Sequence, residues 1–96
     1  MTDFDIELSS FTLNPNYRFQ WEEAQDCHVL LFPEGMIKLG GSAAEIIQRC
    51  TEQTTLAQLV DNLNQAFPDA EGLADDVREF LKDAQQQDWI VAATTD

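Results

Sequence analysis

Cys27 and His28 form the adjacent pair of side chains in this 96-residue chain that is best suited to catalysis. A thiol beside an imidazole acts as a nucleophilic pair when the two side chains hydrogen-bond. The pair begins an apolar run, residues 27–32, whose length and composition predict a strand. Because neighbouring side chains of a strand point to opposite faces, we expect the thiol and the imidazole to lie apart. His28 is also the sole histidine, and no cluster of cysteines or histidines is spaced to bind zinc with it.

The remaining catalytic and cofactor patterns are equally weak. Gly40-Gly41 leads into a predicted helix but lacks the other residues of a P-loop or a dinucleotide-binding motif, so a turn is the better interpretation. Cys27 and Cys50 form no CxxC motif, and we expect two small buried thiols. The 18 acidic residues are spread along the chain, as on a solvated surface. The sequence therefore predicts a protein that is not an enzyme and needs no cofactor, with an enzyme that uses Cys27 as a minor alternative.

The charge balance excludes further classes of protein. Five lysines and arginines oppose 18 aspartates and glutamates, which gives a formal net charge of −13. Nucleic acids and anionic membrane surfaces are bound by clustered cations, and the cations here are scattered. The chain has neither a run of about 18 apolar residues, as a membrane helix needs, nor the features of a signal peptide. We expect no nucleic acid and no membrane as a partner, and a cytoplasmic location.

Three strands are predicted in the first half of the chain. Tyr17, Phe19 and Trp21 alternate with polar residues, which is the strand period. The apolar run 27–32 and the short run 36–39 follow after brief turns. Short connections between successive strands favour an antiparallel three-stranded sheet.

Residues 1–16 are interpreted as a variable leading segment that precedes a domain of residues 17–92. Within this segment, Phe4, Ile6 and Leu8 alternate with acidic residues, which predicts a further strand that would occupy an open sheet edge. A loosely attached tail is the alternative interpretation.

The apolar spacing changes to the helical period after Gly40-Gly41. Ser42 begins the capping box of a first predicted helix, and Thr55 begins that of a second. A third helix is expected over residues 72–87, and residues 89–91 would form a short extended piece. The expected fold class is α+β and winged helix-turn-helix-like, with a three-stranded antiparallel sheet followed by three helices.

An edge strand beside an amphipathic helix is a binding site for an extended peptide. Residues 36–39 form the last predicted strand before the chain leaves the sheet, so one side of this strand should be free. Helix 72–87 would form the other wall of a groove, with core packing as the alternative for each of its apolar residues. Cations on the strand and the helix would pair with peptide carboxylates, each pair contributing about 0–1 kcal/mol. The candidate peptide-binding residues are Met36, Ile37, Lys38, Leu39, Val77, Arg78, Phe80, Leu81 and Ala84.

Several segments, taken in order, resemble the PqqD family over about residues 15–91. The specific signal is the ordered set and not any single motif. The chain departs from the family where Gly40-Gly41 stands in place of a common Asn or Asp, where Thr51-Glu52 lacks a nearby Asp-Gly pair, and where Asp88 precedes the tryptophan in place of a common Gly. All three departures concern turns or caps. The similar segments are Tyr17-Arg18-Phe19-Gln20-Trp21-Glu22-Glu23-Ala24-Gln25, Val29-Leu30-Leu31-Phe32-Pro33-Glu34-Gly35-Met36-Ile37-Lys38-Leu39, Ser42-Ala43-Ala44-Glu45-Ile46-Ile47, Phe67-Pro68, Asp75-Asp76-Val77-Arg78-Glu79-Phe80-Leu81 and Trp89-Ile90.

The resemblance implies a function. PqqD proteins are peptide chaperones of pyrroloquinoline quinone biosynthesis that bind the precursor peptide PqqA. They present it to PqqE, a radical S-adenosylmethionine enzyme that joins a glutamate and a tyrosine of the peptide. In related recognition domains the peptide lies as an added strand between the third strand and the third helix. Here that implies residues 36–39 on one side and Val77, Phe80, Leu81 and Ala84 on the other.

Other interpretations stay open at this point. A winged-helix DNA-binding regulator would use the same fold, although the net charge disfavours it. A structural subunit without a groove is a further alternative. If the protein forms a homodimer, we expect the hairpin to be exchanged at the flexible Gly40-Gly41 joint.

Overall fold

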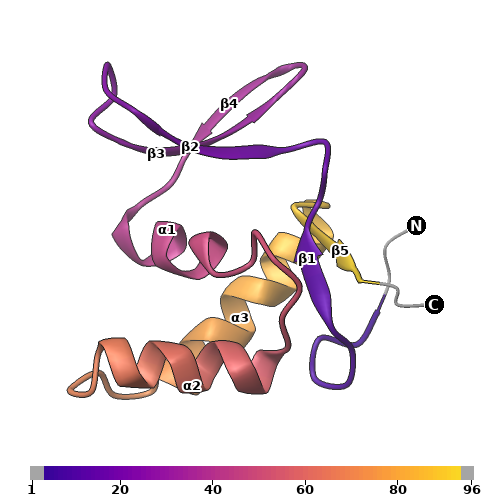
Figure 1. The fold of residues 1–96 in the computed structure, drawn as a ribbon, viewed down its shortest axis with the longest axis vertical. Helices are drawn as coiled ribbons and strands as arrows, with labels where there is room; N and C mark the ends of the chain where they lie inside the picture. Colours follow the sequence, from indigo (N-terminus) through magenta and orange to yellow (C-terminus); the bar gives the residue numbers. More distant parts are fainter. Residues whose placement is uncertain (1–3, 94–96) are drawn as a thin grey trace.

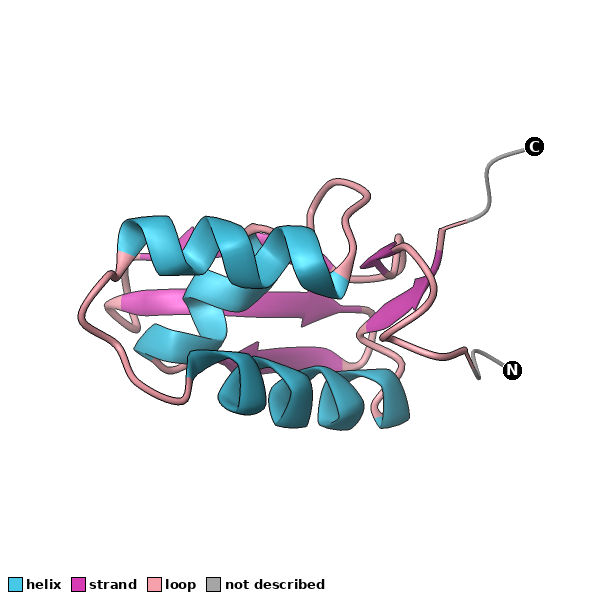
Figure 2. Ribbon diagram, turned by 90° about the horizontal axis from the view of Figure 1, so that it is seen from below, coloured by secondary structure: helices cyan, strands magenta, loops and turns pink. Residues whose placement is uncertain are grey.

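Three helices lie on one side of a three-stranded antiparallel sheet, with the first helix against the sheet and the second farthest from it, and a smaller two-stranded sheet lies beside the helices (Figure 1, Figure 2). The structure, a computed structural model, describes residues 4–93. The predicted α+β class, with a three-stranded sheet followed by three helices, is confirmed. Within the described residues, no helix has the length and apolar character needed to cross a bilayer. The elements are β1 (Phe11–Leu13), β2 (Arg18–Glu22), β3 (Cys27–Phe32), β4 (Gly35–Lys38), α1 (Gly41–Gln48), α2 (Leu56–Ala66), α3 (Leu73–Gln86) and β5 (Ile90–Ala92).

β3 is the central strand of the larger sheet, with β2 and β4 on either side. The register sets Phe19 opposite Leu30, and Leu30 opposite Ile37. These three side chains share one face of the sheet, because residues opposite each other in an antiparallel pair point the same way. They pack with Ile47 of α1, so this face is covered by the helices. β2 and β4 are the two edges, and within the described chain neither has a second strand beside it.

The smaller sheet joins the two ends of the described chain. β1 pairs antiparallel with β5, with Phe11 opposite Ala92 and Leu13 opposite Ile90. The extended piece predicted at residues 89–91 is therefore confirmed as a strand, one residue further along the chain. Its partner β1 was not predicted, and Phe11 within it is completely buried.

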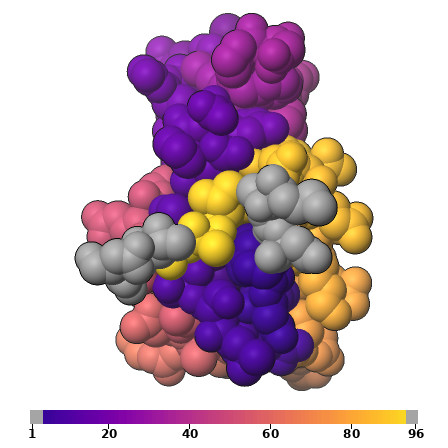
Figure 3. All heavy atoms as spheres, turned by 90° about the vertical axis from the view of Figure 1, so that its right-hand side faces the viewer, coloured from indigo at the N-terminus to yellow at the C-terminus, as the bar shows by residue number. Residues whose placement is uncertain are grey.

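The strand predicted from Phe4, Ile6 and Leu8 is wrong. The chain turns at residues 6–8, because the Asp5 carboxylate accepts a hydrogen bond from the Glu7 N–H at 2.9 Å and the Asp5 carbonyl accepts one from the Leu8 N–H at 3.1 Å. Short acidic side chains often close such turns on their own backbone. Ile6 is buried and Leu8 is 85% exposed. The segment is packed rather than loosely attached, and it lies against the helices instead of the edge of the larger sheet (Figure 3).

The two predicted capping boxes have different outcomes. The Thr55 hydroxyl accepts a hydrogen bond from the Gln58 N–H at 3.2 Å, so the predicted start of α2 is confirmed. α1 instead begins at Gly41 with Gly40 as N-cap and no side-chain cap, so the box starting at Ser42 is wrong. The chain leaves β4 in an extended conformation and enters the helix directly, which places Ser42 inside the first turn. α3 runs close to its predicted bounds.

The core consists of two clusters of buried apolar side chains. The larger cluster lies among α2, α3, β1 and β5 and includes Leu59 and Leu81. The smaller cluster lies between the larger sheet and α1 and includes Leu30. Phe80 of α3 and Trp89 contact both clusters, and their ring centroids are 6.3 Å apart. α3 is therefore held both to the other helices and to the larger sheet.

Candidate functional site

The open side of β4 carries unpaired backbone groups at two residues. The Leu39 N–H donates to the His28 carbonyl of β3 at 2.9 Å. In an antiparallel pair, every second residue directs its N–H and C=O toward the partner strand. Leu39 and Ile37 therefore face β3, and Met36 and Lys38 direct their backbone groups away from it. Because β4 is an edge of the sheet within the described chain, these groups have no strand to bind.

The side chains of β4 alternate as predicted. Met36 is 39% exposed and Lys38 is also exposed, whereas Ile37 is half-buried and Leu39 is buried against the helices. A strand added beside β4 would hydrogen-bond at Met36 and Lys38. Its own side chains would alternate between the face of these two residues and the face covered by the helices.

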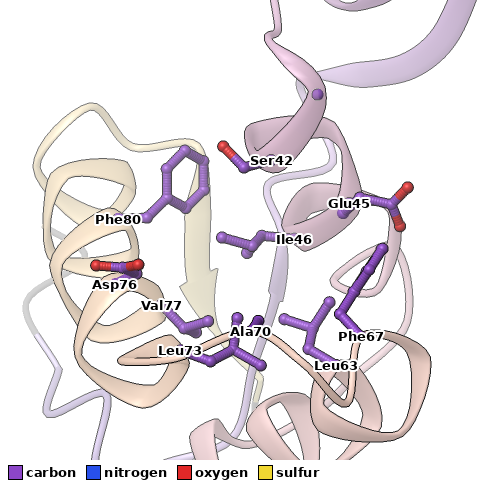
Figure 4. A pocket seen from close by; sticks show the side chains of 11 residues that line it. Ser42, Glu45, Ile46, Leu63, Phe67, Ala70, Leu73, Asp76, Val77 and Phe80 are labelled. Atoms are coloured by element: carbon purple, nitrogen blue, oxygen red, sulfur yellow. The ribbon is translucent and has the colours of Figure 1, made fainter.

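An apolar hollow of about 550 Å³ lies between α1 and α3 (Figure 4). Ile46 of α1 and Val77 of α3 face each other across it, and Phe80 lies near Ser42 at the start of α1. Gly41, one of the lining residues, follows Lys38 at the end of β4 by three positions in the chain. The lining residues are Gly41, Ser42, Glu45, Ile46, Leu63, Phe67, Ala70, Leu73, Asp76, Val77 and Phe80.

The structure brings only part of the predicted helix face to this hollow. Val77 and Phe80 line it. Leu81 and Ala84 do not line it. Val77, Leu81 and Ala84 are all completely buried in the larger core cluster, so core packing holds for all three, and of these apolar residues only Phe80 is partly exposed. Of the predicted groove residues on α3, Val77 and Phe80 thus line the hollow, and Leu81 and Ala84 lie only in the core.

Arg78 lies on another side of α3 from the hollow. Its Nε is 3.1 Å from a carboxylate oxygen of Glu7, and its Nη1 donates to the Asp75 carboxylate at 2.9 Å. The leading segment holds the same helix through Gln85, whose Nε2 donates to the Phe4 carbonyl at 2.6 Å. Figure 3 shows these indigo residues between the residues of α2 and α3. The Arg78 guanidinium is therefore engaged within the chain.

Several residues of the hollow were not predicted. Phe67, next to Pro68 at the end of α2, is 41% exposed, and Leu73 begins α3. An aromatic residue next to a helix-ending proline was the available signal for Phe67. Glu45 and Asp76 bring carboxylates to the hollow, and none of its lining residues is a cation. Glu45 already binds Arg49 at 2.7 Å.

The cysteines and the histidine are not arranged for catalysis. The His28 ring stacks on Phe19 at 4.8 Å and meets the edge of Trp21 at 5.1 Å, on the strand face opposite to Cys27. Burial raises the pKa of the Cys50 thiol to about 12, which keeps it protonated. Among residues 4–93, no group of three His, Cys, Asp or Glu side chains is placed to hold a metal ion.

Comparisons with known proteins agree with one another. The family model described as coenzyme PQQ synthesis protein D (PqqD) matches residues 27–90. The chain is 50% identical over 74 residues to the PqqA binding protein of Rahnella aquatilis, covering 77% of this chain and 78% of that protein. It is 47% identical over 89 residues to the PqqA binding protein of Azotobacter vinelandii, covering 86% of this chain and 97% of that one.

A solved structure shares the fold. It is the solution structure of the PqqD truncation of Methylobacterium extorquens PqqCD, described as a stand-alone recognition element for ribosomally synthesized and post-translationally modified peptides. The two structures superpose with a TM-score of 0.70 over 93% of this chain and 95% of that chain, at 22% sequence identity.

Proposed function

Because the chain belongs to the PqqD family of coenzyme PQQ synthesis proteins, we propose that it is a peptide chaperone of pyrroloquinoline quinone biosynthesis. It binds the precursor peptide PqqA, for which its relatives are named. It catalyses no reaction itself and presents the bound peptide to the radical S-adenosylmethionine enzyme PqqE. This takes place in the cytoplasm, where the peptide is made. The observation that carries the proposal is the unpaired edge of β4, together with an apolar hollow whose lining begins three positions further along the chain at Gly41.

The peptide binds as a fourth strand of the larger sheet. Met36 and Lys38 each offer one N–H and one C=O, so the edge supports up to four backbone hydrogen bonds with the peptide. At a net value of about 0.5–1.5 kcal/mol each, these bonds contribute about 2–6 kcal/mol. Ordering a flexible peptide costs about 2–5 kcal/mol or more, so backbone pairing alone leaves little net affinity.

The hollow supplies the rest of the binding energy. An apolar peptide side chain placed between α1 and α3 contributes about 25 cal/mol for each Å² of apolar surface that leaves water. Burying about 100 Å² would therefore add about 2.5 kcal/mol. The edge strand thus fixes the register of the peptide, and the hollow selects which side chain stands at one position along it.

The predicted binding residues take different parts in this proposal. The peptide lies along Met36, Ile37, Lys38 and Leu39, with the Lys38 ammonium available to a peptide carboxylate. Val77 and Phe80 form the facing wall, and Leu81 and Ala84 support that wall from the core. Arg78 contacts the peptide only after its ion pairs with Glu7 and Asp75 open. Residues 17–92 carry recognition, and the leading segment braces α3.

Amide hydrogen exchange, read by NMR with and without PqqA, tests this arrangement. The amides of Met36 and Lys38 face outward, so we expect fast exchange in the free protein and strong slowing when the peptide binds. The amides of Ile37 and Leu39 already face β3 and serve as internal controls with little change. If PqqA binds while Met36 and Lys38 continue to exchange fast, strand addition at β4 is refuted.

A second experiment tests presentation to PqqE. The rate at which PqqE joins the glutamate and tyrosine of PqqA is measured with and without the chaperone, and with variants that weaken the edge of β4. We expect each variant to lower the rate in proportion to its loss of PqqA affinity. A rate that is independent of the chaperone would contradict presentation and leave peptide binding in place.

A further inference from the structure

The larger sheet has a second open edge at β2. The His28 carbonyl of β3 accepts its hydrogen bond from Leu39, the residue after β4, so the next residue, Val29, directs its backbone groups to β2. Val29 stands opposite Gln20. Phe19 and Trp21, on either side of Gln20, therefore direct their N–H and C=O groups outward. Within the described chain no strand binds them.

The side chains at this edge also leave apolar surface uncovered. Trp21 is 49% exposed, and its ring is 5.1 Å from the His28 ring on the same face of the sheet. Open edge strands with exposed apolar side chains pair readily with further strands. The β2 edge therefore has both the backbone groups and the apolar surface of a pairing site.

The sequence of β2 is complementary to itself in reverse. We propose that β2 pairs antiparallel with β2 of a second copy of this chain, about a two-fold axis at Gln20. In this register Phe19 stands opposite Trp21 of the second copy, and the two-fold axis generates this aromatic pair twice. Arg18 stands opposite Glu22 of the second copy, so a cation faces a carboxylate twice. Shifting the register by two residues removes both Arg18–Glu22 matches and leaves within β2 a single aromatic pair, of Phe19 or of Trp21 with its own copy, at the axis.

The hydrogen-bond phase agrees with this register. Phe19 and Trp21 are the residues whose backbone groups point outward, and they are the ones that the register sets directly opposite each other. Gln20 falls on the axis as a non-hydrogen-bonded pair, in which the two Cα atoms approach to about 4.5 Å. The interface closes under two-fold symmetry, as expected of a homodimer.

The dimer leaves peptide binding unobstructed. Pairing at β2 produces a six-stranded sheet with one β4 at each end, so each copy keeps its open β4 edge. The proposal does not depend on the identity of the peptide. The net charge of −13 on each copy opposes association, so the two Arg18–Glu22 pairs act against a general repulsion.

Charge reversal tests the register by sedimentation velocity over a concentration series. Glu22→Arg sets arginine against arginine, and we expect the dimer dissociation constant to rise by about 2- to 30-fold, because a cross-strand charge pair occurs twice. This variant carries fewer negative charges than the parent chain, so reduced repulsion alone would strengthen the dimer. Arg18→Glu should weaken it as well. The double variant Arg18→Glu with Glu22→Arg restores both pairs and should restore the dimer.

Cysteine cross-linking tests the axis independently, in a Cys27→Ser background. The spacing at Gln20 lies within the range of about 4.4–6.8 Å for disulfide Cα atoms, so Gln20→Cys should oxidise to a covalent dimer. Glu22→Cys alone should stay monomeric, and a mixture of Arg18→Cys and Glu22→Cys chains should give the mixed disulfide. Lys38→Cys, on the β4 edge, is the control for random collision.

Three results would overturn the proposal. The first is a chain that stays monomeric at its highest soluble concentration with Gln20→Cys failing to cross-link. The second is equal cross-linking of Lys38→Cys. The third is a dimer that ignores the charge variants and disappears on Gly40→Ala or Gly41→Ala, which would identify exchange of the sheet at that joint. Both alanines fit sterically, since no atom lies within 4 Å of either added Cβ.

Discussion

The substitution Met36→Pro separates the backbone of the β4 edge from its side chains. Proline removes the N–H of Met36, which points away from β3, so the pairing of β4 with β3 keeps its hydrogen bonds. One of the four proposed bonds to PqqA is then lost. At a net value of about 0.5–1.5 kcal/mol for that bond, the dissociation constant rises by about 2- to 13-fold.

Isothermal titration calorimetry with PqqA measures this change, and two variants act as controls. Met36→Ala keeps the N–H and removes most of the side chain, so it reports the contribution of the side chain alone. Ile37→Pro removes an N–H that faces β3, so its main effect should be a lower free energy of unfolding. If Met36→Pro binds PqqA as tightly as Met36→Ala, the outward N–H of Met36 does not bind the peptide and the strand-addition mechanism is wrong.

Three further predictions address the hollow, the thiols and the leading segment. Phe67→Ala should raise the dissociation constant for PqqA by about fivefold, as expected for about 1 kcal/mol of lost apolar contact. The urea denaturation midpoint should change little, because Phe67 is 41% exposed. An unchanged affinity would mean that the peptide does not contact the hollow. Iodoacetamide should label Cys27 in the native protein and Cys50 only after unfolding, as read by mass spectrometry. Burial raises the pKa of the Cys50 thiol from 9.0 to about 12, so the protonated thiol's contribution to folding stability is complete below pH 9 and is lost as the pH rises toward 12. Ile6→Ala should lower the free energy of unfolding by about 2–4 kcal/mol, because the Ile6 side chain is buried. Glu7→Gln breaks the half-exposed ion pair with Arg78 and should lower the free energy of unfolding by at most about 1 kcal/mol. Equal effects of the two variants would contradict a packed leading segment.

Local periodicity predicted the elements whose pattern is repeated several times. The alternation around Phe19 and the helical spacing around Leu81 each extend over several residues, so the larger sheet and α3 were predictable. The pair β1–β5 was not, because each strand has three residues and the partners lie about 80 positions apart in the chain. Such short strands carry too few alternations to be distinguished from a loop.

The site was predictable to the extent that it depends on strand order. Because strand 36–39 is the last of a meander, its edge position followed from the sequence, and the structure agrees. The division of α3 into wall and core did not follow. Val77 and Leu81 are four positions apart on one stripe and both are completely buried, yet only Val77 lines the hollow. What separates them is the packing of β5 and the leading segment around the C-terminal half of the helix, which no local pattern encodes.

The position of Phe80 has a consequence for selecting altered specificity. Its ring contacts both core clusters and lines the hollow as well. A library randomised at this residue would recover sequences for their ability to fold as much as for their choice of ligand. Ser42 and Ala70 line the same hollow with smaller side chains and belong to neither cluster, so they are the positions at which a new peptide preference should evolve without loss of foldedness.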